Sequence, residues 1–383
     1  MRFVRSLLLV GTALLAAGCS KEKDVEPPAE LVDFRATLAI KRAWNMSVGA
    51  DEVLRLGLSP VADGERAFIA GAGGDVFAVN LANGRSLWRA RLGVELSAGP
   101  GLGDGLVVVG TPKGQVIALD AATGAERWRA GVGGEILSAP AVGGGRVVVH
   151  TVDGRLTALD ASDGRTAWNF EQQVPRLIVR GSASPVIDGD AVLAAFDNGK
   201  VAALTLAEGD LLWSATVATP SGRTELARLV DILGPVRVAG DDVFVAGFQG
   251  RAAMIARNSG QIWWGREYST YRGLALDEDS LYLSTADGSV VALSRRDGTE
   301  RWRTDALIRR GLSGPAVDGD AVVVGDFEGY LHWLDRGSGE MIARTSTDGK
   351  RISHAPVPAG GILLVQTDAG GVYAFRAEPR AAR

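Results

Sequence analysis

Apolar and polar residues follow one another along this chain in short runs that recur at a regular interval. Each unit has an apolar, β-branched run such as 106–110 or 321–325, a glycine, an alternating run, and a turn with a second glycine followed four residues later by tryptophan. Apolar runs of this length bounded by Gly, Asp and Asn predict β-strands, and the repeats show no helical spacing. The pattern therefore predicts an all-β protein.

The unit occurs eight times, and its copies are best aligned on the first glycine: Gly74, Gly114, Gly154, Gly199, Gly250, Gly288, Gly329 and Gly370. The tryptophans keep the same phase at Trp88, Trp128, Trp168, Trp213, Trp264 and Trp302, and Ala343 takes this place in the seventh copy. Four short strands in roughly 40 residues are typical of a β-propeller blade. A solenoid is the competing repeat architecture.

The two ends of the repeat array favour the propeller. The eighth copy, 370–376, stops before its tryptophan strand, whereas 40–49 supplies such a strand, with Trp44, and has no copy in front of it. Pairing these two strands would close a ring and leave only short edges. We therefore predict an eight-bladed β-propeller of four-stranded blades over 38–376, with the strand of Trp44 paired to 372–375.

The recurring polar residues belong to this framework. The stretch "ALDAATGAERW" at 118–128 returns in altered form at 158–168 and 292–302, whereas a site is normally built once. Asp120 and Thr123 suit a turn in which short polar side chains bond the nearby backbone. Trp128 is expected to pack between neighbouring blades.

The first residues predict export. Arg2 and Arg5 precede an apolar run, 7–17, and small residues lead to Cys19, the only cysteine. This is the pattern of a signal peptide, here 1–18, and it is too short for a membrane span. The "AAGC" stretch resembles the lipobox of bacterial lipoproteins, although Ala16 stands where Leu is usual. An ordinary signal peptide cut nearby is the alternative.

The lipoprotein interpretation makes Cys19 the lipidated first residue of the mature chain. Several acyl chains would then hold the protein at a membrane surface. Ser20 after the cysteine implies sorting to the outer membrane in such lipoproteins. We assign 19–37 to the lipidated cysteine and a flexible tether, and 377–383 to a disordered tail.

Charge and motifs argue against several function classes. Lys and Arg number 41 against 45 Asp and Glu, with no long basic stripe, which argues against nucleic acid as a partner. The histidines, 150, 332 and 354, lie in different repeats without metal-ligand spacing, and no phosphate-binding loop occurs. We assign no catalytic residue, no metal and no cofactor.

The pattern formed by Ala118, Asp120, Thr123, Gly124 and Trp128 resembles the repeat of pyrroloquinoline-quinone propellers. That superfamily includes dehydrogenases and non-enzymatic scaffolds. Three stretches resemble one family within it, the BamB lipoproteins of the outer-membrane β-barrel assembly (BAM) complex: 176–186, 224–236 and "GDFEGYLHWLD" at 325–335.

This resemblance implies a lipid-anchored scaffold at the outer membrane that faces the periplasm and is not an enzyme. It also implies binding to the periplasmic POTRA domains of BamA and, through BamA, to the rest of the complex. Contact with unfolded outer-membrane protein substrates is left open. A periplasmic quinoprotein-type dehydrogenase or a ligand-binding propeller is the alternative, but such a dehydrogenase typically needs a vicinal cysteine pair.

Two neighbouring repeats are joined by longer connections than the others. From the repeat tryptophan to the proline that precedes the next apolar run, the interval is 12 residues after Trp88 and Trp128, but 17 after Trp168 and 22 after Trp213. Long loops on a rigid ring commonly carry binding sites. An apolar cluster edged by Arg and Asp fits a protein-binding hot spot.

The candidate partner-binding residues lie on these two connections: Leu177, Ile178, Val179, Arg180, Arg228 and Asp231. The BamB pattern Leu-x-Leu-Arg, which engages the BamA domain, would fall on Leu177, Val179 and Arg180. The family usually has a second acidic residue two positions after Asp231, where this chain has Leu233. The alternative is that the apolar residues pack back onto the ring and the charges are solvated.

Overall fold

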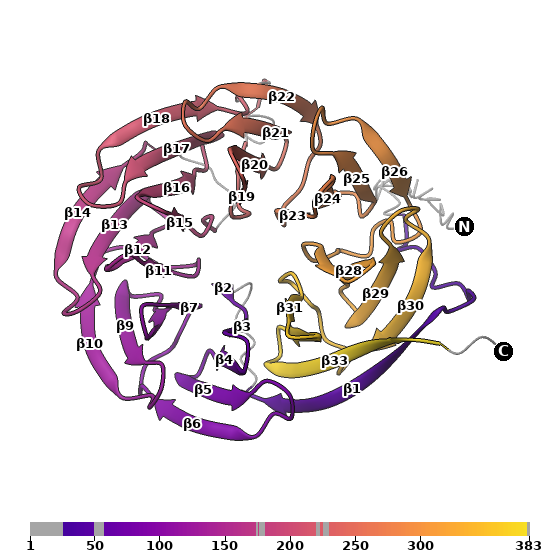
Figure 1. The fold of residues 1–383 in the computed structure, drawn as a ribbon, viewed down its shortest axis with the longest axis horizontal. Coiled ribbons are helices and arrows are strands. Elements are labelled where there is room, and N and C mark those ends of the chain that lie inside the picture. Colours follow the sequence, from indigo (N-terminus) through magenta and orange to yellow (C-terminus); the bar gives the residue numbers. More distant parts are fainter. Residues whose placement is uncertain are drawn as a thin grey trace, which may run out of the picture.

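The structure is a computed structural model that describes residues 26–49, 57–173, 175, 181–219, 223–224 and 230–380. The described residues form strands, turns and connecting segments, and no helix among them has the length and apolarity needed to cross a membrane. Eight β-sheets stand around a central channel like the blades of a propeller (Figure 1). The prediction of an eight-bladed ring is confirmed.

The blades follow one another along the chain, and within each blade we call the strands A to D from the channel outward. Blade 1 contains β3 (Val61–Ala62), β4 (Arg66–Ala70), β5 (Asp75–Asn80) and β6 (Ser86–Arg91). Blade 2 contains β7 (Ala98–Gly103), β8 (Leu106–Gly110), β9 (Gln115–Asp120) and β10 (Glu126–Gly131). Blade 3 contains β11 (Ala141–Gly143), β12 (Arg146–His150), β13 (Arg155–Asp160) and β14 (Thr166–Glu171). Blade 4 contains β15 (Val186–Asp188), β16 (Ala191–Ala195), β17 (Lys200–Thr205) and β18 (Leu211–Thr216).

The second half of the ring has the same order. Blade 5 contains β19 (Arg237–Ala239), β20 (Asp242–Ala246), β21 (Arg251–Ala256) and β22 (Ile262–Glu267). Blade 6 contains β23 (Leu274–Leu276), β24 (Ser280–Ser284), β25 (Val290–Ser294) and β26 (Glu300–Thr304). Blade 7 contains β27 (Ala316–Asp318), β28 (Ala321–Gly325), β29 (Tyr330–Asp335) and β30 (Met341–Ser346). Blade 8 contains β31 (Val357–Ala359), β32 (Ile362–Gln366), β33 (Gly371–Pro379) and β1 (Leu38–Ser47).

The ring closes by joining the two ends of the chain, as predicted. Strand β1 pairs antiparallel with β33, and Trp44 lies opposite Ala374. This pairing extends to Leu38 opposite Pro379, so β33 runs beyond the expected end of the propeller at 376. Blade 2 departs from the four-stranded pattern, because β2 (Gly57–Leu58) adds to β7 in parallel orientation.

The tryptophans of the repeat join each blade to the next, which confirms that they are framework. The indole Nε1 of Trp128 in blade 2 donates to the carbonyl of Ala161 in blade 3 at 2.8 Å. Six other interfaces repeat this bond, from Trp44, Trp88, Trp168, Trp213, Trp264 and Trp302. The indole of the preceding blade leaves room only for glycine in the turn, because a Cβ on Gly124 would be 2.6 Å from Trp88 Cε3.

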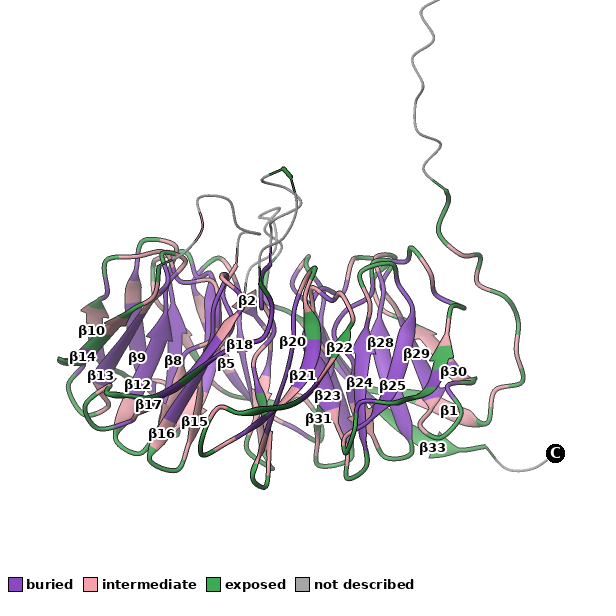
Figure 2. Cartoon of the chain, turned by 90° about the horizontal axis from the view of Figure 1, so that it is seen from above, coloured by how far each residue is buried: buried purple, intermediate pink, exposed green. Residues whose placement is uncertain are grey.

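The interface between blades 7 and 8 is built differently. Ala343 replaces the tryptophan, and the space is filled by Trp333, which is fully buried on β29. Its ring meets that of Phe375 edge to face, with centroids 6.5 Å apart. The buried residues of all blades form clusters between neighbouring sheets, and exposed residues gather at the turns and outer strands (Figure 2).

The topology gives the two faces of the ring different connections. In an antiparallel blade, the A–B and C–D turns lie on one face. The B–C turns and the D–A connections to the next blade lie on the other, which we call the BC/DA face. The two long connections predicted from the sequence, 172–185 and 217–236, are D–A connections of neighbouring blades. They therefore emerge on the same face.

Candidate functional site

The predicted partner-binding residues fall largely outside the described part of the chain. Leu177, Ile178, Val179, Arg180 and Arg228 lie there, and so does the proposed lipidation site Cys19. Asp231 is described. The described ends of both connections show where the segments that carry these residues begin and end.

The connection into blade 4 is held at both ends. Asn198, in the B–C turn of blade 4, donates from Nδ2 to the carbonyl of Gln173 at 3.0 Å. At the other end, Ala183 accepts a 2.9 Å hydrogen bond from His150 Nδ1. Burial lowers the pKa of His150, so the ring is neutral and its single Nδ1 proton serves this bond. His150 is thus a structural residue.

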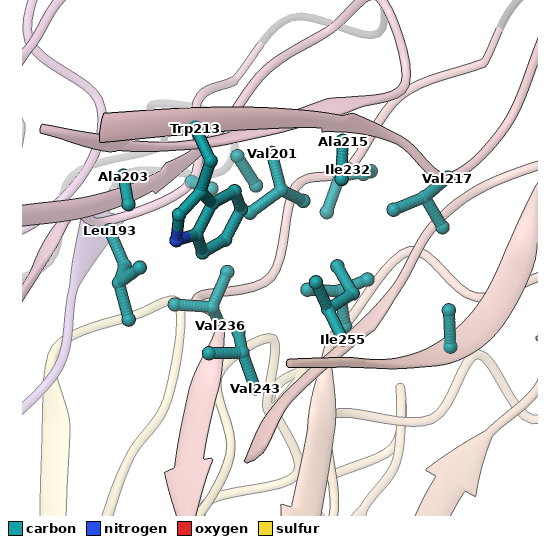
Figure 3. Close-up of a cluster of buried hydrophobic side chains, with 14 residues drawn as sticks. Leu193, Val201, Ala203, Trp213, Ala215, Val217, Ile232, Val236, Val243 and Ile255 are labelled. Atoms are coloured by element: carbon teal, nitrogen blue, oxygen red, sulfur yellow. The ribbon is translucent and has the colours of Figure 1, made fainter. Parts of the chain in front are cut away.

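The connection into blade 5 is anchored in the core between blades 4 and 5. Ile232 and Val236 are 1% exposed and pack with Trp213, Val201 and other buried residues of both blades (Figure 3). The connection also forms two isolated bridges, Asn198 with Val230 and Asp231 with Phe248. It therefore passes between the B–C turns of the two blades.

Asp231 lies in this anchored part, and its side chain is fully buried. The structure therefore does not present it as an outward-facing contact residue. Its burial fits a role in holding this connection in place rather than direct contact with a partner. Its backbone carbonyl accepts from Phe248 N at 2.7 Å, which fixes the connection to blade 5.

A second aspartate beside it was missed by the sequence analysis. Asp197, in the B–C turn of blade 4, is 2% exposed. Burial and the neighbouring charge of Asp231 raise the pKa of Asp197 to about 8, so it holds a proton at neutral pH. The sequence could have revealed Asp197, because an acidic residue is unusual at this turn position. Among the seven other blades only blade 8 has one, Asp368, and the other six have Ala72, Pro112, Val152, Phe248, Ala286 and Phe327.

The stretch 325–335, singled out in the sequence, forms a buried charged cluster in blade 7. Asp326 is completely buried and accepts from Arg310 Nε at 2.8 Å and from His332 Nε2 at 3.0 Å. Arg344 Nε donates to His332 Nδ1 at 3.3 Å, which leaves the ring proton on Nε2. Burial lowers the pKa of His332, although the carboxylate of Asp326 opposes the shift. The ring is therefore neutral, and the cluster is structural.

The N-terminal segment is seated on this part of the ring. Arg310 Nη1 donates to the carbonyl of Ala29 at 3.0 Å, and Arg309 Nε donates to that of Pro27 at 2.8 Å. Further along, the Arg344 guanidinium lies 5.0 Å from the centre of the Phe34 ring. The segment 26–37 runs along the side of the propeller to β1 (Figure 2). Residues 26–37, which the sequence assigned to a flexible tether, are therefore held against the ring by these arginines.

The described residues contain no group of three or more His, Cys, Asp or Glu side chains placed to hold a metal ion. The BC/DA face of blades 4 and 5 holds the described ends of the two long connections, at Asn198, Ala183, Val230 and Ile232. Such an arrangement suits binding of another macromolecule.

Comparison with known proteins gives the family of this chain. A family model described as "Outer membrane protein assembly factor BamB" matches residues 72–304 and 286–381. A protein of that name from Pseudomonas aeruginosa is 49% identical over 370 residues, covering 96% of this chain and 97% of the relative. The chain belongs to the BamB family of outer membrane protein assembly factors.

Other BamB proteins extend the relationship. One from Burkholderia pseudomallei is 38% identical and covers 98% of each chain. The crystal structure of BamB from Moraxella catarrhalis superimposes with a TM-score of 0.78 at 30% identity, covering 87% of this chain and all of that one. A quinohemoprotein alcohol dehydrogenase from Comamonas testosteroni reaches a TM-score of 0.68, but at 15% identity this shows the shared fold alone. The alternative of a quinoprotein-type enzyme is not favoured.

Proposed function

We propose that this protein is a non-enzymatic scaffold at the outer membrane that assists the assembly of β-barrel proteins as part of the BAM complex. Membership of the BamB family, whose relatives are named assembly factors over almost the whole chain, carries this proposal. The closed ring supports it. A closed ring has few free strand edges, so it can display loops without pairing with strands of other proteins.

The partner proposed for the two long connections is the periplasmic POTRA region of BamA. Leu177 and Val179 would each contribute roughly 1.5 to 3 kcal/mol if fully buried against it. Arg180 offers a planar set of donors to a carboxylate or to the carbonyls of a strand edge. The neighbouring Asp231 is buried, so its proposed role is to position this surface.

The proposed anchor is lipid on Cys19, which would place the propeller in the periplasm at the inner side of the outer membrane. Only residues 20–25 separate Cys19 from the segment that contacts the ring, which begins at Glu26. An extended chain spans at most about 3.3 to 3.6 Å per residue, so the seated segment would lie roughly 25 Å or less from the membrane surface.

Pull-down with the purified periplasmic region of BamA tests the surface. Arg180→Glu should bind less than Arg180→Ala, because it adds repulsion or an unpaired buried charge to the lost contact. Leu177→Ala should also reduce binding. Arg85→Glu is the matched control, since Arg85 is an exposed arginine on the opposite face, in the C–D turn of blade 1. Losses equal to those of this control would refute the proposed surface.

Melting temperature measured on the same variants separates binding from folding. Substitutions at Leu177 and Arg180 should leave it nearly unchanged while pull-down falls. A fall of both together would mean that the connection is structural and that the partner binds elsewhere.

Fractionation tests the anchor. Cys19→Ala should leave a folded propeller that is released from the membrane fraction after a high-salt wash. Retention of the variant in that fraction would mean either that Cys19 is not lipidated or that the partner alone holds the protein there. Combining Cys19→Ala with Arg180→Glu distinguishes the two, because only partner-dependent retention is lost in the double variant.

A further inference from the structure

The A strands of the blades surround a channel through the centre of the ring (Figure 1). Near the BC/DA face, residues at and just before the starts of the A strands line a cavity of about 640 Å³. That volume is within the usual range for small-molecule sites, roughly 300 to 1,000 Å³. The ends of the two long connections border this cavity, at Gly181–Ser184 and Leu233–Pro235, but its described lining does not include Asp231. The scaffold function proposed above assigns the cavity no role.

One residue of the cavity departs from the pattern that the other blades keep. Arg237 begins the A strand of blade 5 and lies opposite Phe244 of the B strand. The residues at the matching register in the seven other blades are small or aliphatic: Val61, Gly101, Ala141, Val186, Ala275, Ala316 and Val357. The fold is therefore built without a charge at this position, and Arg237 requires another explanation.

The guanidinium of Arg237 is only partly satisfied by the protein. Its Nε donates to the carbonyl of Leu274 in blade 6 at 3.3 Å, and no carboxylate of the described residues forms an ion pair with it. The side chain is reached by water in the channel, yet the surrounding protein lowers the pKa of the guanidinium. A bound anion would offset this cost to the charged form.

Most of the other residues that line the cavity are apolar or small, and the polar ones are five serines, Tyr271, His354 and Arg272. Its described lining contains no Asp or Glu, and Arg272 contributes a second positive charge two residues before Leu274. The walls include five prolines and three leucines: Pro60, Pro100, Pro235, Pro356, Pro358, Leu137, Leu233 and Leu274. An apolar wall beside an arginine fits a ligand with both an apolar body and an acidic group, and arginine pairs with carboxylates through two parallel hydrogen bonds.

We propose that this cavity binds a carboxylate attached to an apolar body, either a small organic acid or the end of a peptide, and that Arg237 is the residue that pairs with the carboxylate.

Calorimetric titration with N-acetyl-leucine tests this, because the compound carries the carboxylate and apolar body common to both sources. The protein should bind it, whereas N-acetyl-leucinamide, which has the same body without the charge, and inorganic phosphate, which has the charge without the body, should bind at least about tenfold more weakly. Equal binding of N-acetyl-leucinamide, or of phosphate, would overturn the proposed ligand class.

Arg237→Leu replaces the arginine by an aliphatic residue, the kind that blades 1, 4 and 8 have at the same register with Val61, Val186 and Val357. It should weaken N-acetyl-leucine binding by about tenfold or more while the melting temperature stays constant or rises. Arg237→Lys should bind with intermediate affinity, since it keeps the charge but loses the planar donors. Arg301→Leu, at an exposed arginine on the outer strand of blade 6, is the matched control and should bind normally.

Two results would contradict the assignment of Arg237. Undiminished binding by Arg237→Leu would place the carboxylate elsewhere. A fall in melting temperature in both Arg237→Leu and Arg237→Lys would make the bond to Leu274 the reason for the arginine. If only the leucine variant fails to fold, Arg237→Lys still decides the matter, because unchanged binding there would exclude paired recognition by the guanidinium.

A chain end and a free acid are distinguished by a third titration. A short peptide with a carboxyl-terminal leucine should bind at least as tightly as N-acetyl-leucine if the ligand is a chain end, and more weakly if it is a free acid. Rejection of both would refute the proposal. Because none of these titrations contains BamA, their outcome is independent of the proposed partner surface.

Discussion

Two aspartates in the B–C turns of different blades are almost completely removed from solvent, Asp326 in blade 7 and Asp197 in blade 4. Their exposed fractions are 0% and 2%, and both lie on the BC/DA face. Their surroundings differ in charge. Asp326 lies among cationic and neutral donors, whereas Asp197 lies beside the second carboxylate, Asp231.

This difference moves the two pKa values in opposite directions. Burial alone would raise the pKa of Asp326, but hydrogen bonds from His332, Tyr330 N and Arg310 lower it overall. At Asp197 burial is reinforced by the charge of Asp231, and the pKa rises to about 8. Burial therefore does not decide whether an aspartate is charged, because its partners do.

The comparison also separates a structural cluster from a proposed binding surface. The Asp326 cluster holds the N-terminal segment through Arg310 and is closed to solvent. Asp197 lies at the base of the two connections proposed to bind BamA. A poorly compensated buried carboxylate costs stability, and such costs are commonly retained where function requires them.

The largest effect is expected from Asp326→Asn. The substitution removes the buried charge partner of Arg310, whose side chain is 4% exposed, and leaves it only the half-exposed Glu328. Removal of one member of a buried ion pair costs about 3 to 5 kcal/mol, and the remaining pair sets the loss toward the lower end of this range. Denaturant unfolding should show this loss in the free energy of unfolding. Asp297→Asn, in an exposed C–D turn of blade 6, is the control. A loss no larger than that of the control would mean that the cluster is not essential to blade 7.

The next effect is a change in pH dependence caused by Asp197→Asn. Between about pH 4, the ordinary value for Asp, and about pH 8, the folded protein binds a proton at Asp197 that the unfolded chain does not. The stability from this proton is complete below the ordinary pKa and is lost as the pH rises through the raised one. Asn mimics the protonated form, so the gain in stability of the variant over wild type should be larger at pH 8.5 than at pH 5.5. An equal difference at both pH values would refute a raised pKa.

A smaller effect is expected from Asp231→Asn. Removing the neighbouring charge should lower the pKa of Asp197, but burial is the larger cause and stays, so the pKa should remain above its ordinary value. Carbon-detected NMR titration of the Asp197 carboxyl measures this directly. An unchanged midpoint would show that the two carboxylates are not coupled.

The smallest effect is expected at the exposed ion pair of the ring-closing strands. Lys41 Nζ lies 2.6 Å from Glu378, with side chains 65% and 48% exposed. Exposed pairs of this kind contribute about 0 to 1 kcal/mol, so Lys41→Ala should scarcely change the denaturation midpoint. A loss approaching that of Asp326→Asn would show that closure of β1 on β33 depends on this pair rather than on buried residues such as Trp44.

The framework was predictable because each blade repeats its local information. The phase of Trp88 and Trp128, the turn glycines and the incomplete repeats at both ends were enough to predict eight blades and the pairing of Trp44 with the last blade. The site was less predictable. Of its six residues the structure describes Asp231 alone, and the sequence could not show that this aspartate is buried.

By itself, the sequence determined the architecture of this protein. Its repeat of strand, turn and tryptophan specifies contacts within one blade or between one blade and the next, and these contacts recur around the ring. The tertiary structure decided which charges are satisfied. Asp197 meets Asp231, Arg310 meets Asp326 and Ala29, and Arg237 enters the central channel, each through contacts between segments from different blades or from the N-terminal segment. The charge state of a side chain depends on what surrounds it in space, and a repeat pattern carries no information about those singular neighbours.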